Sequence, residues 1–193
     1  MARTKLQEER SKKTRKRRRK EIVKSSIKVF SEMGLDGASI RAIAKGSGIS
    51  LALLYKYFEN KDEIIRECTV TFHERIQKHI TRIVVREIND PDALSNRTVN
   101  YIDRVIDICR FLLQVMAHPI YSKMMDDTNI LTQNQIEEAA NAISDAYGTD
   151  PNIALSASIL LNSTINDYIL KKSRENYFRQ MDGVKILFMG TKA

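Results

Sequence analysis

The sequence predicts an all-α protein, and two observations carry that prediction. Apolar residues recur at helical intervals through most of the 193 residues, and no stretch alternates apolar and polar residues as a half-buried strand would. Glycine, proline and helix-capping residues interrupt this pattern repeatedly, which divides the chain into about nine helices. The length allows one substantial core and a small second domain.

A first helix and a short second one are predicted near the N-terminus. Apolar side chains recur with helical spacing over residues 22–33, and Gly34 ends that helix. Ser39 is placed to cap the second helix, which runs for about two turns before Gly46 and Gly48 end it. A glycine suits the tight turn that follows, because a left-handed backbone conformation costs glycine little.

The third helix is also predicted to be short. Ser50 is placed to cap a helix from Leu51 to about Tyr57, and Leu54 and Phe58 are spaced to point inward. Two short helices joined by a glycine turn are typical of a helix-turn-helix unit.

Longer helices are predicted through the rest of the chain. Asn60 can cap a fourth helix, and Asp90 followed by Pro91 marks the start of the next one. The remaining helices are expected from Pro91 to about Met116, from Thr128 or Asn129 to about Tyr147, from Pro151 to about Lys172 and from about Glu175 to Phe188, with a short segment through Met125.

Positive charge is concentrated at the N-terminus. The net charge is +8, but residues 1–20 alone hold eleven Lys or Arg against two Glu, so the rest of the chain sums to −1. Eight of the nine residues from Lys12 to Lys20 are Lys or Arg. This asymmetry predicts that a polyanion meets one end of the protein. The alternative is a disordered, solvated tail that serves solubility.

The sequence contains none of the groupings that catalysis or metal binding requires. There is no nucleophile–base grouping and no glycine-rich phosphate loop; Cys68 and Cys109 lack CxxC spacing, and the three histidines are scattered. No apolar run approaches the length of a membrane span, and the N-terminus lacks a signal-peptide pattern. We therefore expect a soluble cytoplasmic protein that is not an enzyme, has no contact with a membrane and uses no cofactor or metal.

An ordered set of residues runs through the short N-terminal helices: Phe30, Gly34, Ser39-Ile40, Ile43-Ala44, Ser47-Gly48-Ile49-Ser50, Leu54-Tyr55, Tyr57-Phe58 and Lys61-Asp62-Glu63. With this spacing, the region resembles the DNA-binding domain of TetR-family transcriptional regulators. The resemblance covers about residues 18–66 and implies a three-helix helix-turn-helix domain there, followed by a helical effector-binding and dimerisation domain at 67–193. The charge distribution adds a basic arm at residues 1–17. The resemblance also implies a homodimer that binds a palindromic operator in double-stranded DNA.

The third helix is the expected reading helix, which enters the major groove. A helical wheel places Ala52, Leu53, Lys56 and Tyr57 on its outer face. Leu51 and Tyr55 lie at the boundary of that face, and the resemblance favours DNA contact for both. Because the first turn offers Leu51, Ala52 and Leu53 and no Arg, Asn or Gln, we expect contacts with thymine methyl groups in place of bidentate hydrogen bonds.

Phosphate contacts are expected around the reading helix. The candidates are Ser39, Ser50, Lys56, Tyr57 and Lys61. The alternative for the serines is a purely capping role, and for the lysines a solvated face. Arg41 is expected to contact either a guanine or a phosphate, and Arg17, Arg18 and Arg19 of the basic run to contact the minor groove or the backbone.

The last two helices are expected to form the dimer interface. The C-terminal domain at residues 67–193, called the body below, is also expected to hold an effector. The predicted dimer stripe is Ala154, Ser158, Leu161, Ile165 and Ile169, unless it faces the core of its own protomer. A cavity for a small hydrophobic or amphipathic effector could be lined by Tyr101, Arg104, Phe111, Met116, Met124, Met125, Asn162 and Asn166.

These features favour a ligand-responsive transcriptional repressor. The second hypothesis is a DNA-binding protein whose body binds another protein in place of a metabolite. An enclosed cavity in the body would favour the first hypothesis, and a solid core would favour the second.

Overall fold

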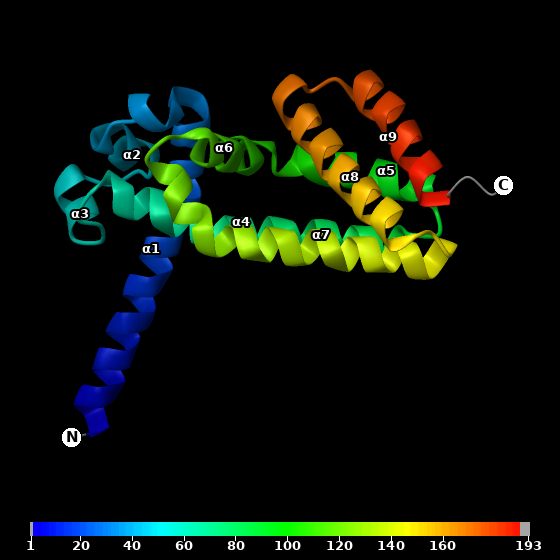
Figure 1. Ribbon diagram of the computed structural model, residues 1–193. Coiled ribbons are helices and arrows are strands. Elements are labelled where there is room, and N and C mark those ends of the chain that lie inside the picture. Colours follow the sequence, from blue (N-terminus) through cyan, green and yellow to red (C-terminus); the bar gives the residue numbers. More distant parts are fainter. Residues whose placement is uncertain (1, 190–193) are drawn as a thin grey trace. The chain divides into compact units, whose positions relative to one another are not determined.

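The computed structural model describes the backbone of residues 2–189 and the side chains of these residues except 2–6, 8 and 124–132. The described residues form nine α-helices and one 3-10 helix and contain no strand, which confirms the all-α prediction (Figure 1). The chain divides after Thr71 into two compact units. The helices are α1 (Ala2–Gly37), α2 (Ile40–Gly46), α3 (Leu51–Tyr55), α4 (Lys61–Glu87), α5 (Pro91–Arg104), α6 (Ile106–Ala117), the 3-10 helix η1 (Tyr121–Met125), α7 (Asp126–Tyr147), α8 (Pro151–Lys171) and α9 (Arg174–Met189).

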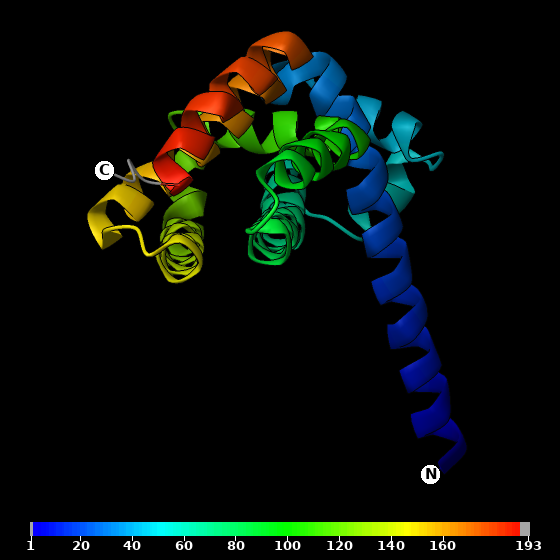
Figure 2. The same ribbon diagram turned by 90° about the vertical axis from the view of Figure 1, so that its right-hand side faces the viewer.

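Helix α1 begins at Ala2 and includes the whole basic run (Figures 1 and 2). Apolar spacing starts only at Ile22, so it does not predict the first half of this helix. Lys, Arg, Gln and Glu nevertheless have high helix propensity, and no Gly or Pro precedes Gly34 to interrupt them. Gly34 leaves the helical conformation with a φ of 75°, which confirms the predicted end.

Helices α2 and α3 begin at the predicted serine caps. The Ser39 hydroxyl accepts a hydrogen bond from the Ala42 N–H at 3.1 Å, and the Ser50 hydroxyl accepts one from the Leu53 N–H at 3.2 Å. Between the two helices Gly48 has a φ of 65°, a conformation that permits the tight turn. Helix α3 ends at Tyr55, slightly before the expected Tyr57.

The core of the first unit joins these short helices to α1 and α4. Phe30, Ile43, Leu54 and Phe58 are fully buried in it. Helix α2 lies close to α1 at Gly46, where a Cβ atom would come within 2.6 Å of a Val29 methyl group. The absence of a side chain at Gly46 thus allows the two helices to pack closely, and this holds the helix-turn-helix unit in place.

The second unit is built around α8, which packs against both α7 and α9, while α9 also contacts α5. The helix expected from Pro91 to Met116 is in fact two helices, α5 and α6, which meet at Val105 with φ −123° and ψ 19°. No Gly or Pro marks this break, and the apolar pattern continues through it, so periodicity alone could not reveal it. Helix α7 starts at Asp126, slightly before the expected Thr128 or Asn129.

The stripe predicted for dimerisation lies instead in the interior of the second unit. Its five members are buried, with exposed fractions of 4% or less: Ala154, Ser158, Leu161, Ile165 and Ile169. The alternative that they face the core of their own protomer is therefore correct. Along α9, Tyr177, Met181, Val184 and Phe188 are buried in the same way.

Helix α8 also departs from a second expectation. By length and composition alone it is apolar enough to cross a membrane, and it is the one such helix in the described part of the chain. Its inner face is nevertheless part of the protein core, since eight of its residues are buried against neighbouring helices. We therefore interpret α8 as a core helix with an apolar outer face.

Candidate DNA interface and body cavity

Helix α3 presents an exposed face, as expected for a reading helix. Leu54 is completely buried and holds the helix on the core, whereas Leu53 and Tyr55 are 36% and 51% exposed. Ala52 and Lys56 are also exposed, and Leu51 and Tyr57 are partly so. The structure thus confirms the orientation of α3 on the helical wheel and places Tyr55 on the outer face.

The two serine caps lie beside this face, at the N-termini of α2 and α3. Each hydroxyl accepts a hydrogen bond from a backbone N–H, so the capping role is confirmed. A hydroxyl can also donate, and capping therefore remains compatible with phosphate contact. Arg41, in the first turn of α2, is exposed.

Lys61 has a structural contact at the start of α4. Its ammonium group donates a hydrogen bond to the Leu35 carbonyl at 2.8 Å and lies 3.5 Å from the Asp36 carbonyl. These carbonyls belong to the last turn of α1, where a positive charge is favourable. Lys61 therefore joins the end of α1 to the start of α4, and the ammonium keeps a third donor.

Arg19 occupies a different environment from the other arginines of the basic run. Its guanidinium donates hydrogen bonds to the Tyr57 carbonyl, to Glu63 at 2.8 Å and to Glu67, and it lies 4.2 Å above the centre of the Phe58 ring. The side chain is 24% exposed. Because its donors are engaged within the unit, Arg19 stabilises the fold, and its contact with DNA stays a prediction.

The charges of this cluster support one another. Burial acts to raise the pKa of Glu63, but hydrogen bonds from the Glu59 N–H and the Arg19 guanidinium outweigh it, so the pKa of Glu63 is lowered. Burial likewise acts to lower the pKa of Arg19, but Glu67 and Glu63 outweigh it and raise that pKa. Glu63 and the Arg19 guanidinium therefore stabilise each other's charged form.

Replacing Arg19 with alanine should lower the free energy of unfolding by about 2 kcal/mol, because two carboxylates would be left facing each other. Arg18→Ala is the matched control, since Arg18 is exposed and pairs only with Glu21 on its own helix. Urea unfolding followed by circular dichroism measures both. Equal losses in the two variants would contradict the structural role of Arg19.

The same cluster predicts a pH dependence. Since the folded pKa of Glu63 is lowered from 4.5, its contribution to stability is present above pH 4.5 and is lost as the pH falls through the folded pKa. Arg19→Ala should therefore lose less stability than the wild type on acidification through this range. Unfolding curves at a series of acidic pH values would measure the difference.

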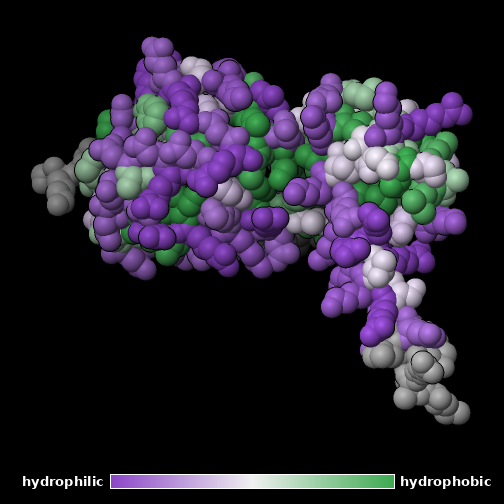
Figure 3. All heavy atoms as spheres, turned by 180° about the vertical axis from the view of Figure 1, so that it is seen from behind, coloured by the Kyte–Doolittle hydropathy of each residue, from purple (hydrophilic) through white to green (hydrophobic). Residues whose placement is uncertain are grey.

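The other arginines of the run are exposed. Arg17 and Arg18 form ion pairs with Glu21 at 3.6 and 2.9 Å. Figure 3 shows mainly hydrophilic side chains along this part of α1. Exposed ion pairs of this kind are weak and can exchange their partner for a phosphate.

Arg15 contacts the end of α3, which was not predicted from the sequence. Its guanidinium donates a hydrogen bond to the Lys56 carbonyl at 3.3 Å, at the C-terminal end of α3. Together with Thr14, Lys56 and Tyr57 it lines a groove between α1 and the residues that follow α3. The signal was available, because Arg15 lies one helical turn before Arg19 and so on the same face of α1.

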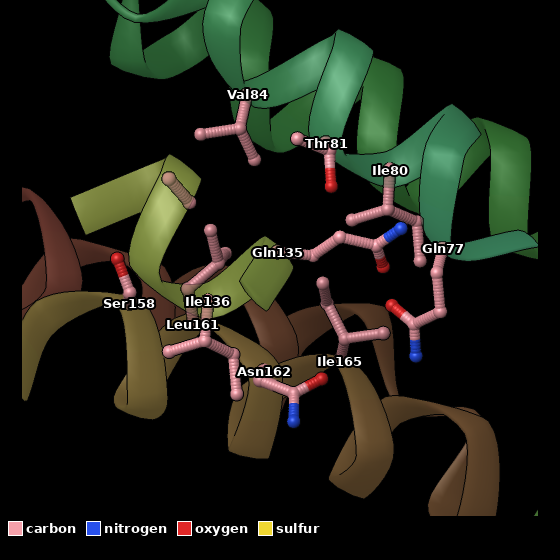
Figure 4. A pocket seen from close by; sticks show the side chains of 11 residues that line it. Gln77, Ile80, Thr81, Val84, Gln135, Ile136, Ser158, Leu161, Asn162 and Ile165 are labelled. Atoms are coloured by element: carbon pink, nitrogen blue, oxygen red, sulfur yellow. The ribbon is translucent and has the colours of Figure 1, made fainter. Parts of the chain in front are cut away.

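The body contains a small cavity between α4, α7 and α8 (Figure 4). Its volume is about 30 Å³, and its lining side chains are all uncharged. Two buried polar atoms at its wall, Gln135 Oε1 and Ser158 Oγ, have no hydrogen-bond partner among the described residues. The cavity is lined by Gln77, Ile80, Thr81, Val84, Gln135, Ile136, Ala139, Ser158, Leu161, Asn162 and Ile165.

Among the candidates whose side chains the structure describes, one lines this cavity. Asn162 does, whereas Phe111 is buried elsewhere in the core and Met116 is 45% exposed. Tyr101 and Arg104 lie on a different groove, between α4 and α5, and Asn166 lines neither. The side chains of Met124 and Met125 lie outside the described residues.

The region that contains α2 and α3 is similar to known DNA-binding proteins. Residues 22–68 match the model of the family described as bacterial regulatory proteins, tetR family. The chain is 38% identical over 72 residues to the HTH-type transcriptional regulator PksA of Bacillus subtilis, a match that covers 37% of this chain and 35% of PksA. It is 29% identical over 119 residues to the HTH-type nicotine-responsive transcriptional repressor HdnoR of Paenarthrobacter nicotinovorans, covering 62% of this chain and 52% of HdnoR.

The fold of the whole chain is also similar to that of solved structures. The TetR family transcriptional regulator PfmR from Thermus thermophilus superposes with a TM-score of 0.65 at 19% identity, over 89% of this chain and 99% of PfmR. The chain thus spans about half of the length of these curated relatives or less, whereas the structural similarity covers 89% of this chain. The first of the two units therefore carries a DNA-binding domain of the TetR family of transcriptional regulators, and the fold of the chain is similar to that of a TetR-family structure.

Proposed function

We propose that the protein is a homodimeric repressor that binds a palindromic operator in double-stranded DNA and is released from it by a small molecule. The observation that carries the proposal is the exposed face of α3, beside two capped helix N-termini and a strongly basic α1. Two such units related by a two-fold axis read half-sites about one helical turn, or a multiple of it, apart. In this role the protein acts in the cytoplasm and catalyses no reaction.

In the proposed complex, α3 reads the bases and its surroundings bind phosphate. Leu51, Ala52, Leu53 and Tyr55 face the base edges, and Arg41 lies beside them on α2. The phosphate contacts are proposed for Ser39, Ser50, Lys56, Tyr57 and Lys61, and for Arg17 and Arg18 on α1. Gel-shift assays on genomic fragments at low ionic strength test the proposal, and the absence of any preferred fragment would refute it.

The exposed leucine of α3 predicts a sensitivity to thymine methyl groups. Replacing each contacted thymine of a selected operator with deoxyuridine should weaken binding by about 0.8 kcal/mol, or roughly fourfold, because one buried methyl group is lost. In the variant Leu53→Ala the same replacement should have a smaller effect. Fluorescence anisotropy with paired operators measures both, and equal sensitivity in the variant would show that Leu53 does not contact a methyl group.

The proposed effector is uncharged, since no ionised side chain lines the cavity between α4, α7 and α8. Gln135 Oε1 and Ser158 Oγ are unpartnered acceptors there, so a ligand with hydrogen-bond donors is favoured. A volume of about 30 Å³ holds only water-sized groups, so the three helices must separate to admit an effector. Such a ligand binds one of two conformations better, which is the requirement for releasing the operator.

Because the cavity is small, we also consider a second function, in which the body binds a protein partner. The two functions differ in what stabilises the purified protein. A library of uncharged metabolites screened by thermal shift should raise the melting temperature in the first case. If no compound does so and a polypeptide co-purifies in fixed ratio, the second function holds.

A further inference from the structure

A second groove of the body lies between α4 and α5, away from the residues that line the uncharged cavity. Its volume is about 320 Å³, at the lower end of the range of small-molecule sites. Both helices contribute to it within the second unit. The groove is lined by His79, Arg82, Ile83, Arg86, Glu87, Arg97, Asn100, Tyr101 and Arg104.

The groove is strongly positive. Four arginines line it, against Glu87 as the one carboxylate among its lining residues. The chain after residue 20 is nearly neutral, with a net charge of −1. The four arginines therefore make this groove much more positive than the rest of that region. Like charges one helical turn apart, such as Arg82 and Arg86, destabilise a helix, and a bound anion would remove that repulsion.

Glu87 positions two of these arginines without neutralising the groove. Its Oε1 lies 3.2 Å from Arg86 Nε and 3.0 Å from Arg97 Nε, and its side chain is only 11% exposed. Neither ion pair has the geometry of a hydrogen bond, because Glu87 Oε1 accepts none from the described residues. The guanidinium groups of Arg86 and Arg97 therefore keep N–H donors for another acceptor. Arg82 is exposed and has no ion pair in the described part of the chain.

An aromatic wall stands beside these charges. The rings of His79 on α4 and Tyr101 on α5 stack with their centres 3.9 Å apart and their planes at 21°. Tyr101 is partly buried and His79 is exposed, so the pair can be extended by another planar ring on the outer face of His79. A cationic groove beside a stacking platform is suited to a ligand that carries both phosphate groups and an aromatic ring.

We propose that this groove binds a nucleotide. The guanidinium groups of Arg82, Arg86 and Arg97 bind its phosphates, and its base stacks on His79. Arginine suits this role because its planar fork donates two parallel hydrogen bonds to a phosphate. The site goes beyond the proposed regulatory function and does not depend on it, because nucleotide binding can be measured without DNA.

Isothermal titration of the full-length protein with ATP and with inorganic pyrophosphate tests the proposal. ATP should bind with micromolar affinity, and the double variant Arg82→Gln/Arg86→Gln should weaken it by roughly tenfold or more, because two phosphate contacts are lost. The matched control is Arg17→Gln/Arg18→Gln, which removes the same charge from α1 and should leave ATP affinity within about twofold. Circular dichroism confirms folding, and Arg82→Gln alone serves if the double variant unfolds.

A separate experiment tests whether the nucleotide base stacks on His79. His79→Ala should weaken ATP by roughly fivefold, the loss of one stacking contact, and leave pyrophosphate unchanged. Three results would overturn the proposal: no binding of ATP, an equal loss in the α1 control, or pyrophosphate binding as tightly as ATP with no effect of His79→Ala. The second result would assign the binding to the basic helix, and the third would reduce the groove to an anion site.

Discussion

Replacing Ile159 with aspartate should make the protein monomeric and abolish specific DNA binding at physiological salt. Ile159 is 50% exposed on the outer face of α8, and Leu155 and Leu160 are exposed near it. On α9, Ile186 and Met189 are exposed as well. Large apolar side chains exposed on two neighbouring helices are typical of an interface between subunits, and a carboxylate there would be buried without a partner.

The expected loss of DNA affinity is large because a monomer keeps only one of two half-sites. Specific complexes are typically about a thousandfold or more tighter than nonspecific ones, and half of the contacts cannot supply that difference. Size-exclusion chromatography with light scattering gives the mass, and anisotropy with a selected operator gives the affinity. Val85→Asp is the matched control, because Val85 is 45% exposed on α4, outside the two helices. A dimeric Ile159→Asp variant would refute this interface.

Deleting residues 2–15 should flatten the dependence of DNA affinity on salt. Arg10, Lys12, Lys13 and Arg15 are exposed on this part of α1. Each phosphate that such a side chain neutralises contributes about 0.9 to the slope of log affinity against log salt concentration, so four contacts would change the slope by roughly 3.6. The Arg19 cluster remains in the shortened chain, so the unit should stay folded. Anisotropy titrations from low to moderate salt measure the slope.

Two outcomes separate the possible roles of this segment. An unchanged slope would mean that the segment is only solvated surface. The variant Thr14→Pro keeps every charge but breaks the helix. If affinity falls in this variant, the helix is needed to position the charges; if it does not, charge alone is sufficient.

The local features of the DNA-binding unit could be predicted from the sequence, because they depend on residues a few positions apart. Ser39, Ser50 and Gly48 specify caps and a turn through their own chemistry. The start of α1 could not be predicted in this way, since a run of charged residues has no apolar face to reveal a helix. The break at Val105 was missed because no Gly or Pro marks it and the apolar pattern continues through it.

The face of α8 was assigned incorrectly for a different reason. This helix carries apolar residues on both sides, Leu161 and Ile165 on the inner one and Ile159 and Leu160 on the outer one. Periodicity shows that such stripes exist, but it cannot show which of them faces the core. Arg19 was similarly hidden among seven other basic residues, because its partners Glu63 and Glu67 lie more than forty residues away in the sequence.

The continuity of α1 has a consequence for the energetics of DNA binding. The exposed basic residues and the Arg19 cluster belong to one unbroken helix, and Arg15 joins this helix to the end of α3. The cationic side chains are therefore preorganised at fixed spacings relative to the exposed face of α3, which we propose to read the bases. Unlike a flexible tail, such a helix loses little conformational entropy when it meets the duplex, so more of the electrostatic attraction is retained as affinity.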